Sequence, residues 1–172
     1  MTPLRGLAYL LLSYLALVAI ATLATLLPLH SWVPEVTLLF LLHLGLQSRG
    51  TAPGNVGLAL VIGYLVDLFS GAPRGLHALT YAVVMVIALG ASQRLLVASK
   101  WQQVVIAFLT SLGHGALLVA LSAPMYDGEA LPALALLPAT AFSTAIVAPF
   151  VFALCRRVDK RLQPDPRALR LG

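Results

Sequence analysis

Long apolar runs constrain this chain more than any other feature of its sequence. Of its 172 residues, 60% are hydrophobic and 10% are charged, and the mean hydropathy is +0.94. Soluble domains carry roughly 25% charged residues. A run of about 20 apolar residues is long enough to cross the hydrocarbon layer of a bilayer as a helix. The sequence therefore predicts an all-α integral membrane protein, and no long polar stretch is present to form a soluble domain.

Six apolar runs predict six transmembrane helices packed as one compact bundle, a single domain over residues 1–155. The approximate spans are 7–27, 34–47, 55–69, 76–96, 102–122 and 131–154, and a basic, exposed cytoplasmic tail follows over residues 156–172. The second and third spans are short. At about 1.5 Å per residue, 34–47 covers roughly 21 Å, so it must thin the bilayer or lie shielded among other helices. Prolines in and near the sixth span predict kinks.

The basic residues predict how the chain is oriented. With six spans, ten of the eleven Lys and Arg residues fall on one side and only Arg74 on the other. The ten are Arg5, Arg49, Arg94, Lys100, Arg156, Arg157, Lys160, Arg161, Arg167 and Arg170. The positive-inside rule then makes both termini cytoplasmic, whereas a five-span arrangement would divide the basic residues between the two sides. Topology and attraction to lipid headgroups explain these residues, and no motif supports nucleic-acid binding.

Asp67 is the strongest functional candidate, because a carboxylate at membrane depth faces protein or trapped water instead of lipid. Ala59, Gly63 and Asp67 recur at four-residue steps, so they line one helix face that we expect to be buried against a neighbouring backbone. Ser70 and Gly71 then end the helix, and the turn through Arg74 and Gly75 leads into the next apolar run. The stretch predicts a rigid helical hairpin. Asp67 is either a structural cap or tie, or a contact for a partner.

The histidines do not predict a metal site, because none of the four has the i, i+4 spacing of a zinc-binding helix. His77 follows the turn and could form a polar cluster with Asp67 and Arg74 on the outer side. Such a cluster would either be a functional site or only form hydrogen bonds between helices and with interfacial water. We expect His43 and His114 to be hydrogen-bonded core residues.

Neither catalysis nor a cofactor is predicted. The chain has no nucleophile elbow and no phosphate-binding loop, and Asp67 is the only acid that we expect within the membrane, with Glu35 in an outer loop. The lone cysteine, Cys155, fits a packing role in an apolar helix. Two rows of small residues on the sixth span predict that this helix packs on two neighbours. They are Ala135, Ala139 and Ser143, and Thr140, Thr144 and Ala148.

The run from Ile62 to Gly71, with Asp67, Ser70 and Gly71 inside it and Gly75 after it, resembles the central signature of the rod shape-determining MreD family. Trp101, Gln102 and Gln103, placed in a cytoplasmic loop before the fifth span, add to the resemblance, as does the basic end of the chain. The resemblance is most specific over residues 56–112. Arg74 departs from the family, in which an aliphatic residue often precedes the second glycine.

The resemblance implies a non-enzymatic component of the bacterial inner membrane that belongs to the cell-elongation machinery. Such proteins work with MreC, a single-span protein, with RodA and its transpeptidase partner, and indirectly with MreB. The family is also thought to share the six-helix architecture of the substrate-binding subunits of energy-coupling-factor transporters. We therefore expect a scaffold whose small-residue faces, including that of Ala59, Gly63 and Asp67, receive the helix of an MreC-like partner.

Two other functions remain open from the sequence. The first is a small-solute binding subunit of a transporter, with a vitamin-like ligand in an outer pocket lined by Asp67, His77 and Tyr81. A ligand retained through purification would favour this alternative, whereas a retained single-span protein would favour the scaffold. The second is a membrane enzyme, for which the chain offers no constellation of nucleophile, base or metal ligands.

Overall fold

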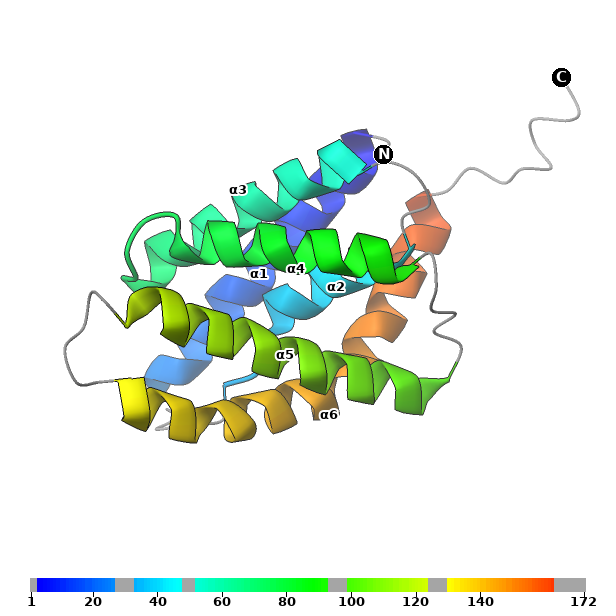
Figure 1. The fold of residues 1–172 in the computed structure, drawn as a ribbon. Helices are drawn as coiled ribbons and strands as arrows, with labels where there is room; N and C mark the ends of the chain where they lie inside the picture. Colours follow the sequence, from blue (N-terminus) through cyan, green and yellow to red (C-terminus); the bar gives the residue numbers. More distant parts are fainter. Residues whose placement is uncertain (1–2, 27–32, 48–51, 93–98, 124–129, 163–172) are drawn as a thin grey trace, which may run out of the picture.

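A computed structural model describes residues 3–26, 33–47, 52–92, 99–123 and 130–162 (Figure 1). This described part of the chain forms six α-helices and no strand, as the sequence predicts. The helices are α1 (Pro3–Leu26), α2 (Val36–Gln47), α3 (Ala52–Ser70), α4 (Leu76–Ser92), α5 (Lys100–Ser122) and α6 (Ala130–Leu162). We call the end of the protein that carries Arg5 and the last turns of α6 the Arg5 end. The opposite end, with the turn between α3 and α4, is the Asp67 end.

Among the described residues, four helices are long and apolar enough to cross a membrane. These spans are Leu4–Leu23, Pro53–Ser70, Lys100–Ser122 and Leu134–Leu162. The helix α3 has 19 residues and is longer than its predicted span, because Pro53 falls in the first turn, where a helix tolerates proline. The helices α2 and α4 are shorter, with 12 and 17 residues, so the crossings assigned to them stay predictions.

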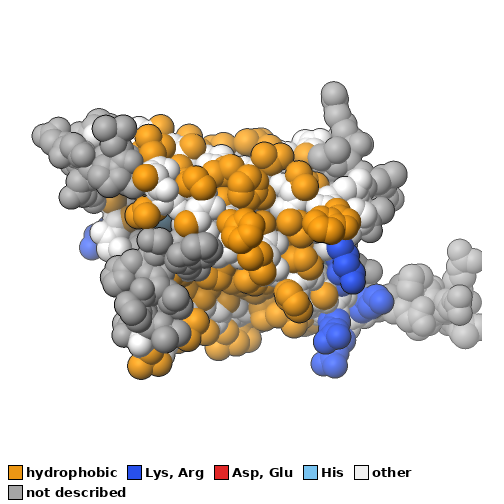
Figure 2. Space-filling view, turned by 90° about the horizontal axis from the view of Figure 1, so that it is seen from below, with side chains coloured by type: hydrophobic (Ala, Val, Ile, Leu, Met, Phe, Trp, Pro, Cys, Tyr) orange, Lys and Arg blue, Asp and Glu red, His pale blue; other side chains and the backbone are white. Residues whose placement is uncertain are grey.

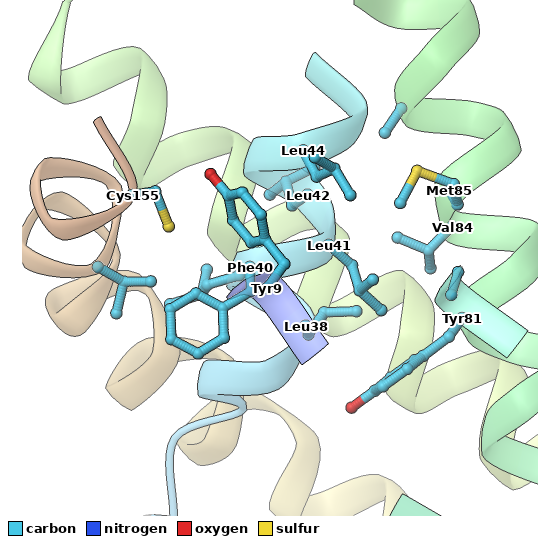
Figure 3. Packing of buried hydrophobic residues seen from close by; sticks show 14 of the residues in the cluster. Tyr9, Leu38, Phe40, Leu41, Leu42, Leu44, Tyr81, Val84, Met85 and Cys155 are labelled. Atoms are coloured by element: carbon cyan, nitrogen blue, oxygen red, sulfur yellow. The ribbon is translucent and has the colours of Figure 1, made fainter. Parts of the chain in front are cut away.

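The short helix α2 lies at the centre of the protein. Every residue from Thr37 to Gly45 is buried, and α2 contacts each of the other five helices. Figure 3 shows leucines of α2 beside Tyr9 of α1, Met85 of α4 and Cys155 of α6. Of the two alternatives expected for this short segment, the structure shows burial among other helices. Cys155 has the predicted packing role, since it is fully buried in this cluster.

Glycines bring neighbouring helices into close contact at two places in this core. A Cβ atom placed on Gly63 would lie 2.5 Å from Ala78 Cα and 2.6 Å from the carbonyl oxygen of His77, both at the start of α4. A Cβ atom on Gly45 would lie 2.6 Å from Ala88 Cβ. Real Cβ atoms do not approach so closely, so α3 and α2 can pack on α4 in this way only with glycine at these positions.

Apolar side chains cover the outer surface over the middle of the protein, and Lys and Arg side chains gather at one end (Figure 2). On α1, outward residues such as Leu7, Leu11 and Leu15 are more than half exposed. In a soluble protein such a surface would be an aggregation hazard. Here it is the surface that faces lipid, and the protein is a multi-pass membrane protein.

Two further differences from the sequence prediction concern the end of α6 and the start of α5. The helix α6 continues to Leu162, beyond residue 155, and Asp159 on its last turns is 5% exposed, so the prediction of an exposed chain from Arg156 onward is wrong there. Pro138 and Pro149 lie inside α6, and Figure 1 shows this helix changing direction along its length, as the prolines predict.

The second difference concerns Trp101, Gln102 and Gln103, which lie in the first turn of α5 and not in a loop. The side chain of Ser99 accepts a hydrogen bond from the backbone N–H of Gln102, and the side chain of Gln102 accepts one from the backbone N–H of Ser99. This reciprocal pair is a capping box, which starts a helix although all of its residues are polar. Trp101 is 80% exposed, whereas Gln103 is buried.

Candidate functional site

Asp67, near the end of α3, caps the first turn of α4. Its Oδ2 accepts hydrogen bonds from the backbone N–H groups of Gly75 at 2.8 Å and Ala78 at 3.4 Å. Its Oδ1 accepts one from the backbone N–H of His77 at 2.9 Å and lies 2.9 Å from His77 Nδ1. A carboxylate offers only acceptors, so Nδ1 must carry the hydrogen. The side chain is fully buried, so these groups replace the water that Asp67 loses.

The turn between α3 and α4 makes this capping possible. Gly71 and Gly75 have φ values of 68° and 94°, which favour glycine because they require the left-handed region. The chain thereby reverses direction within a few residues and presents the N–H groups of α4 to the end of α3. The predicted cluster forms only in part: His77 contacts Asp67, and Arg74 is exposed and makes no ion pair with a described residue. Ser70 is also exposed and accepts a long hydrogen bond, 3.4 Å, from Ala72.

A second set of polar groups lies beside this hairpin and is centred on His114 of α5. Its Nδ1 is 3.1 Å from Glu35 Oε1, and its Nε2 is 3.2 Å from Thr80 Oγ1 on α4. The ring also lies 6.1 Å from that of His77 and 5.0 Å from that of Tyr81, measured between centroids. His114 is 1% exposed and hydrogen bonded, so the prediction for this residue is confirmed.

Glu35, immediately before α2, completes this set. Its Oε2 accepts a hydrogen bond from Ser111 at 2.8 Å, and its backbone N–H donates to Thr144 Oγ1 at 3.0 Å. The contacts of Glu35 and His114 therefore connect α2, α4, α5 and α6 at the Asp67 end. We refer to Asp67, His77, Thr80, His114 and Glu35 as the outer polar cluster.

A third carboxylate ties helices together at the Arg5 end. Asp159 accepts two hydrogen bonds from Arg5, at 2.8 Å from Nε and 3.0 Å from Nη2. His43 Nε2 lies 3.3 Å from Asp159 Oδ2, so α1, α2 and α6 meet at this residue. The parallel pair of bonds from a guanidinium is the strongest form of this interaction. His43 is buried and hydrogen bonded, as predicted.

The small-residue face of α3 is buried, as its spacing predicts: Ala59 is 0% exposed and Gly63 is also buried. It is covered by α4 of the same chain, so a partner helix has no access to it in this structure. Of the two rows on α6, Thr144 and Ala148 are fully buried. The other row is more accessible, since Ala135 is exposed and Ala139 and Ser143 are half-buried.

A cavity of about 310 Å³ lies between α4 and α5, with residues of α2 at its base. None of the three residues that we expected in an outer solute pocket lines it. Asp67 and Tyr81 are buried, and Tyr81 packs edge-on against His77, so these side chains fill space in the outer polar cluster. The cavity and the cluster share one residue, His114.

The two other carboxylates of these networks, Glu35 and Asp159, were not identified as site residues in the sequence. Glu35 lies 76 and 79 positions from Ser111 and His114, and nothing in one sequence shows such a contact. Asp159 gave a signal: Ala148, Phe152 and Cys155 precede it at helical spacing and are all buried. That stripe predicts that Asp159 continues the buried face of the same helix.

The arrangement holds helices together and does not expose reactive groups. Within the described residues, each of the three carboxylates is engaged by hydrogen-bond donors, and no group of three metal-ligating side chains converges. The fold and these sites define a polytopic helical membrane protein whose buried polar residues connect its helices. A family model described as rod shape-determining protein MreD matches residues 2–158, and the chain belongs to this family.

No curated protein matches the chain. No solved structure matches it either, so the likeness to the transporter subunits stays a prediction.

Proposed function

We propose that this protein is a non-enzymatic scaffold of the bacterial rod complex, which supports peptidoglycan synthesis and cell shape by binding an MreC-like single-span partner. The match to the MreD family over residues 2–158 carries the proposal, since that family determines rod shape. Asp67 and Asp159 are buried and Glu35 is partly buried, and all three carboxylates make contacts that connect helices, which is consistent with a structural role.

The proposal includes an orientation. The Arg5 end, where α1 begins and α6 ends, carries four exposed basic residues: Lys100, Arg157, Lys160 and Arg161. By the positive-inside rule the Arg5 end faces the cytoplasm, and the hairpin at the Asp67 end faces outward from the inner membrane. A cysteine introduced at Arg74 would then react with a membrane-impermeant maleimide in intact spheroplasts, whereas one at Lys160 would not.

The accessible row on α6 is the surface that we propose for the partner helix. Ala135, Ala139 and Ser143 are small and lie four residues apart, so a second helix can approach the α6 backbone closely there. This surface replaces the face of Ala59 and Gly63, which α4 covers.

Copurification tests both levels of the proposal. The protein and the MreC-like protein of the same bacterium would be coexpressed, and the complex isolated in mild detergent through a tag on one partner. If the MreC-like protein did not copurify with the wild-type protein although both were folded, the result would contradict the scaffold proposal. Ala139→Leu should reduce recovery several-fold, and Ala116→Leu, at an exposed alanine of α5, is the matched control. Equal recovery from both variants would reject the α6 surface and leave the scaffold standing.

A further inference from the structure

The helices α4 and α5 form a wedge that is closed at one end. At the Asp67 end, Thr80 and Tyr81 of α4 contact His114 of α5, through a 3.2 Å hydrogen-bond contact and a 5.0 Å ring contact. Figure 1 shows the two helices diverging from there toward the Arg5 end. The cavity of about 310 Å³ lies in this wedge, with Leu42 and Leu46 of α2 at its base.

The wedge is apolar and opens sideways. Its walls are aliphatic except for Thr110 and His114, and both nitrogens of His114 already have partners. Ile87 and Leu109, on the two sides, are 65% and 61% exposed, so the opening faces the lipid. An occupant must therefore be apolar along its length.

The length of the wedge distinguishes a lipid chain from a helix. The lining residues of α5 run from Ile106 to Leu117, which is roughly 17 Å at about 1.5 Å per residue. One leaflet contributes about half of the roughly 30 Å hydrocarbon layer. An acyl chain from one leaflet matches this length. A helix that crosses the whole bilayer does not, because the contacts of Thr80 and Tyr81 with His114 hold α4 and α5 together at the Asp67 end.

Charge at the open end indicates the headgroup. Lys100 lies six residues before Ile106, about 9 Å along α5, and is exposed. Arg157, Lys160 and Arg161 are exposed at the same end, and the one described carboxylate there, Asp159, is buried against Arg5. Among the described residues this end therefore presents only positive charge to the headgroup layer, which attracts anionic lipids.

We propose that the wedge between α4 and α5 binds one acyl chain of an anionic phospholipid from the leaflet at the Arg5 end, with its headgroup beside Lys100. The site is independent of the partner surface on α6. It also reaches His114, so an occupied wedge packs against a residue of the outer polar cluster.

Gly113→Leu tests the cavity. A Cβ at Gly113 has no neighbour within 4 Å and Gly113 lines the cavity, so we expect a leucine there to fill part of the wedge and to favour the helix. Gly57→Leu is the matched control, since Gly57 of α3 is also exposed, has an equally open environment and does not line the cavity. Both variants of the full chain would be purified in mild detergent and titrated with phosphatidylglycerol, and binding would be followed by native mass spectrometry.

We expect the wild-type protein and Gly57→Leu to retain one tightly bound phosphatidylglycerol, and Gly113→Leu to bind it at least tenfold more weakly. Equal binding by all three proteins would overturn the site, and an equal loss in both variants would show only non-specific lipid. Lys100→Gln should reduce the preference for phosphatidylglycerol over phosphatidylcholine roughly fivefold, and Lys160→Gln should reduce it less. An unchanged preference in Lys100→Gln would overturn the headgroup assignment.

A second readout does not depend on any variant. A phospholipid with a photoreactive group midway along its acyl chain should label the wild-type protein within 83–91 and 106–117. Labelling spread evenly over these segments and the exposed face of α1 would contradict a defined site.

Discussion

Replacing Asp67 by asparagine tests whether the cap on α4 stabilises the protein. The substitution keeps the shape of the side chain but exchanges one acceptor oxygen for a donor NH₂ group. In one orientation, the NH₂ group faces the N–H groups of Gly75 and Ala78. In the other it faces the backbone N–H of His77. Either way, at least one buried donor meets another donor and loses its partner.

The expected loss follows from these contacts. A hydrogen bond to a charged group contributes about 1.5–3 kcal/mol, and a buried group left unpaired costs about 1–3 kcal/mol. We therefore expect Asp67→Asn to lower the free energy of unfolding by about 3 kcal/mol. Asp67→Leu, which removes every acceptor, should lower it by about 4 kcal/mol.

Unfolding by sodium dodecyl sulfate in mixed micelles, followed by far-ultraviolet circular dichroism, measures this difference. Ser70→Ala is the control, because Ser70 is exposed and its one hydrogen bond is long, so its effect should stay within about 0.5 kcal/mol. If Asp67→Asn had the same free energy of unfolding as Ser70→Ala, the cap would not stabilise the hairpin and the reasoning would fail.

Three further changes test other contacts. Gly63→Ala should lower the free energy of unfolding by about 2 kcal/mol, because the methyl group meets the α4 backbone. Gly57→Ala, where the added methyl group has no neighbour, should raise it by about 0.5 kcal/mol, and the same detergent titration measures both. Asp159→Leu should lower the free energy of unfolding by about 3 kcal/mol, and adding Arg5→Met should recover part of this loss. If the losses of the two single variants simply added in the double variant, the double-mutant cycle would contradict the pairing. Ser99→Ala should weaken the first turn of α5 by about 1 kcal/mol, seen as faster amide exchange confined to that turn.

Local patterns predicted much of this protein, because most of its helices are contiguous apolar runs. The spacing of Ala59, Gly63 and Asp67 identified a buried face, and the glycines at 71 and 75 identified the turn. These features depend on neighbours along the chain. What the spacing could not show is that α4 of the same chain covers that face.

The errors also have physical reasons. Trp101, Gln102 and Gln103 are polar or amphipathic, and hydropathy alone places such residues in a loop. The Ser99 capping box was the opposing signal. Asp159 lies among cations and looks solvated, although the stripe that ends in Cys155 continues through it.

The short length of α2 accounts for the positions of two carboxylates, Glu35 and Asp159. Its 12 residues extend about 18 Å, well short of the roughly 30 Å hydrocarbon layer, so at least one end of this central helix lies at membrane depth. Lipid cannot satisfy the backbone groups that a helix end leaves unpaired. At one end, the N–H of Glu35 donates to Thr144, and its side chain binds His114. Near the other end, His43 contacts Asp159, which is neutralised by Arg5. These contacts connect the short helix to α1, α5 and α6. Lengthening α2 with apolar residues would therefore move its ends away from these partners and displace the helices that they join.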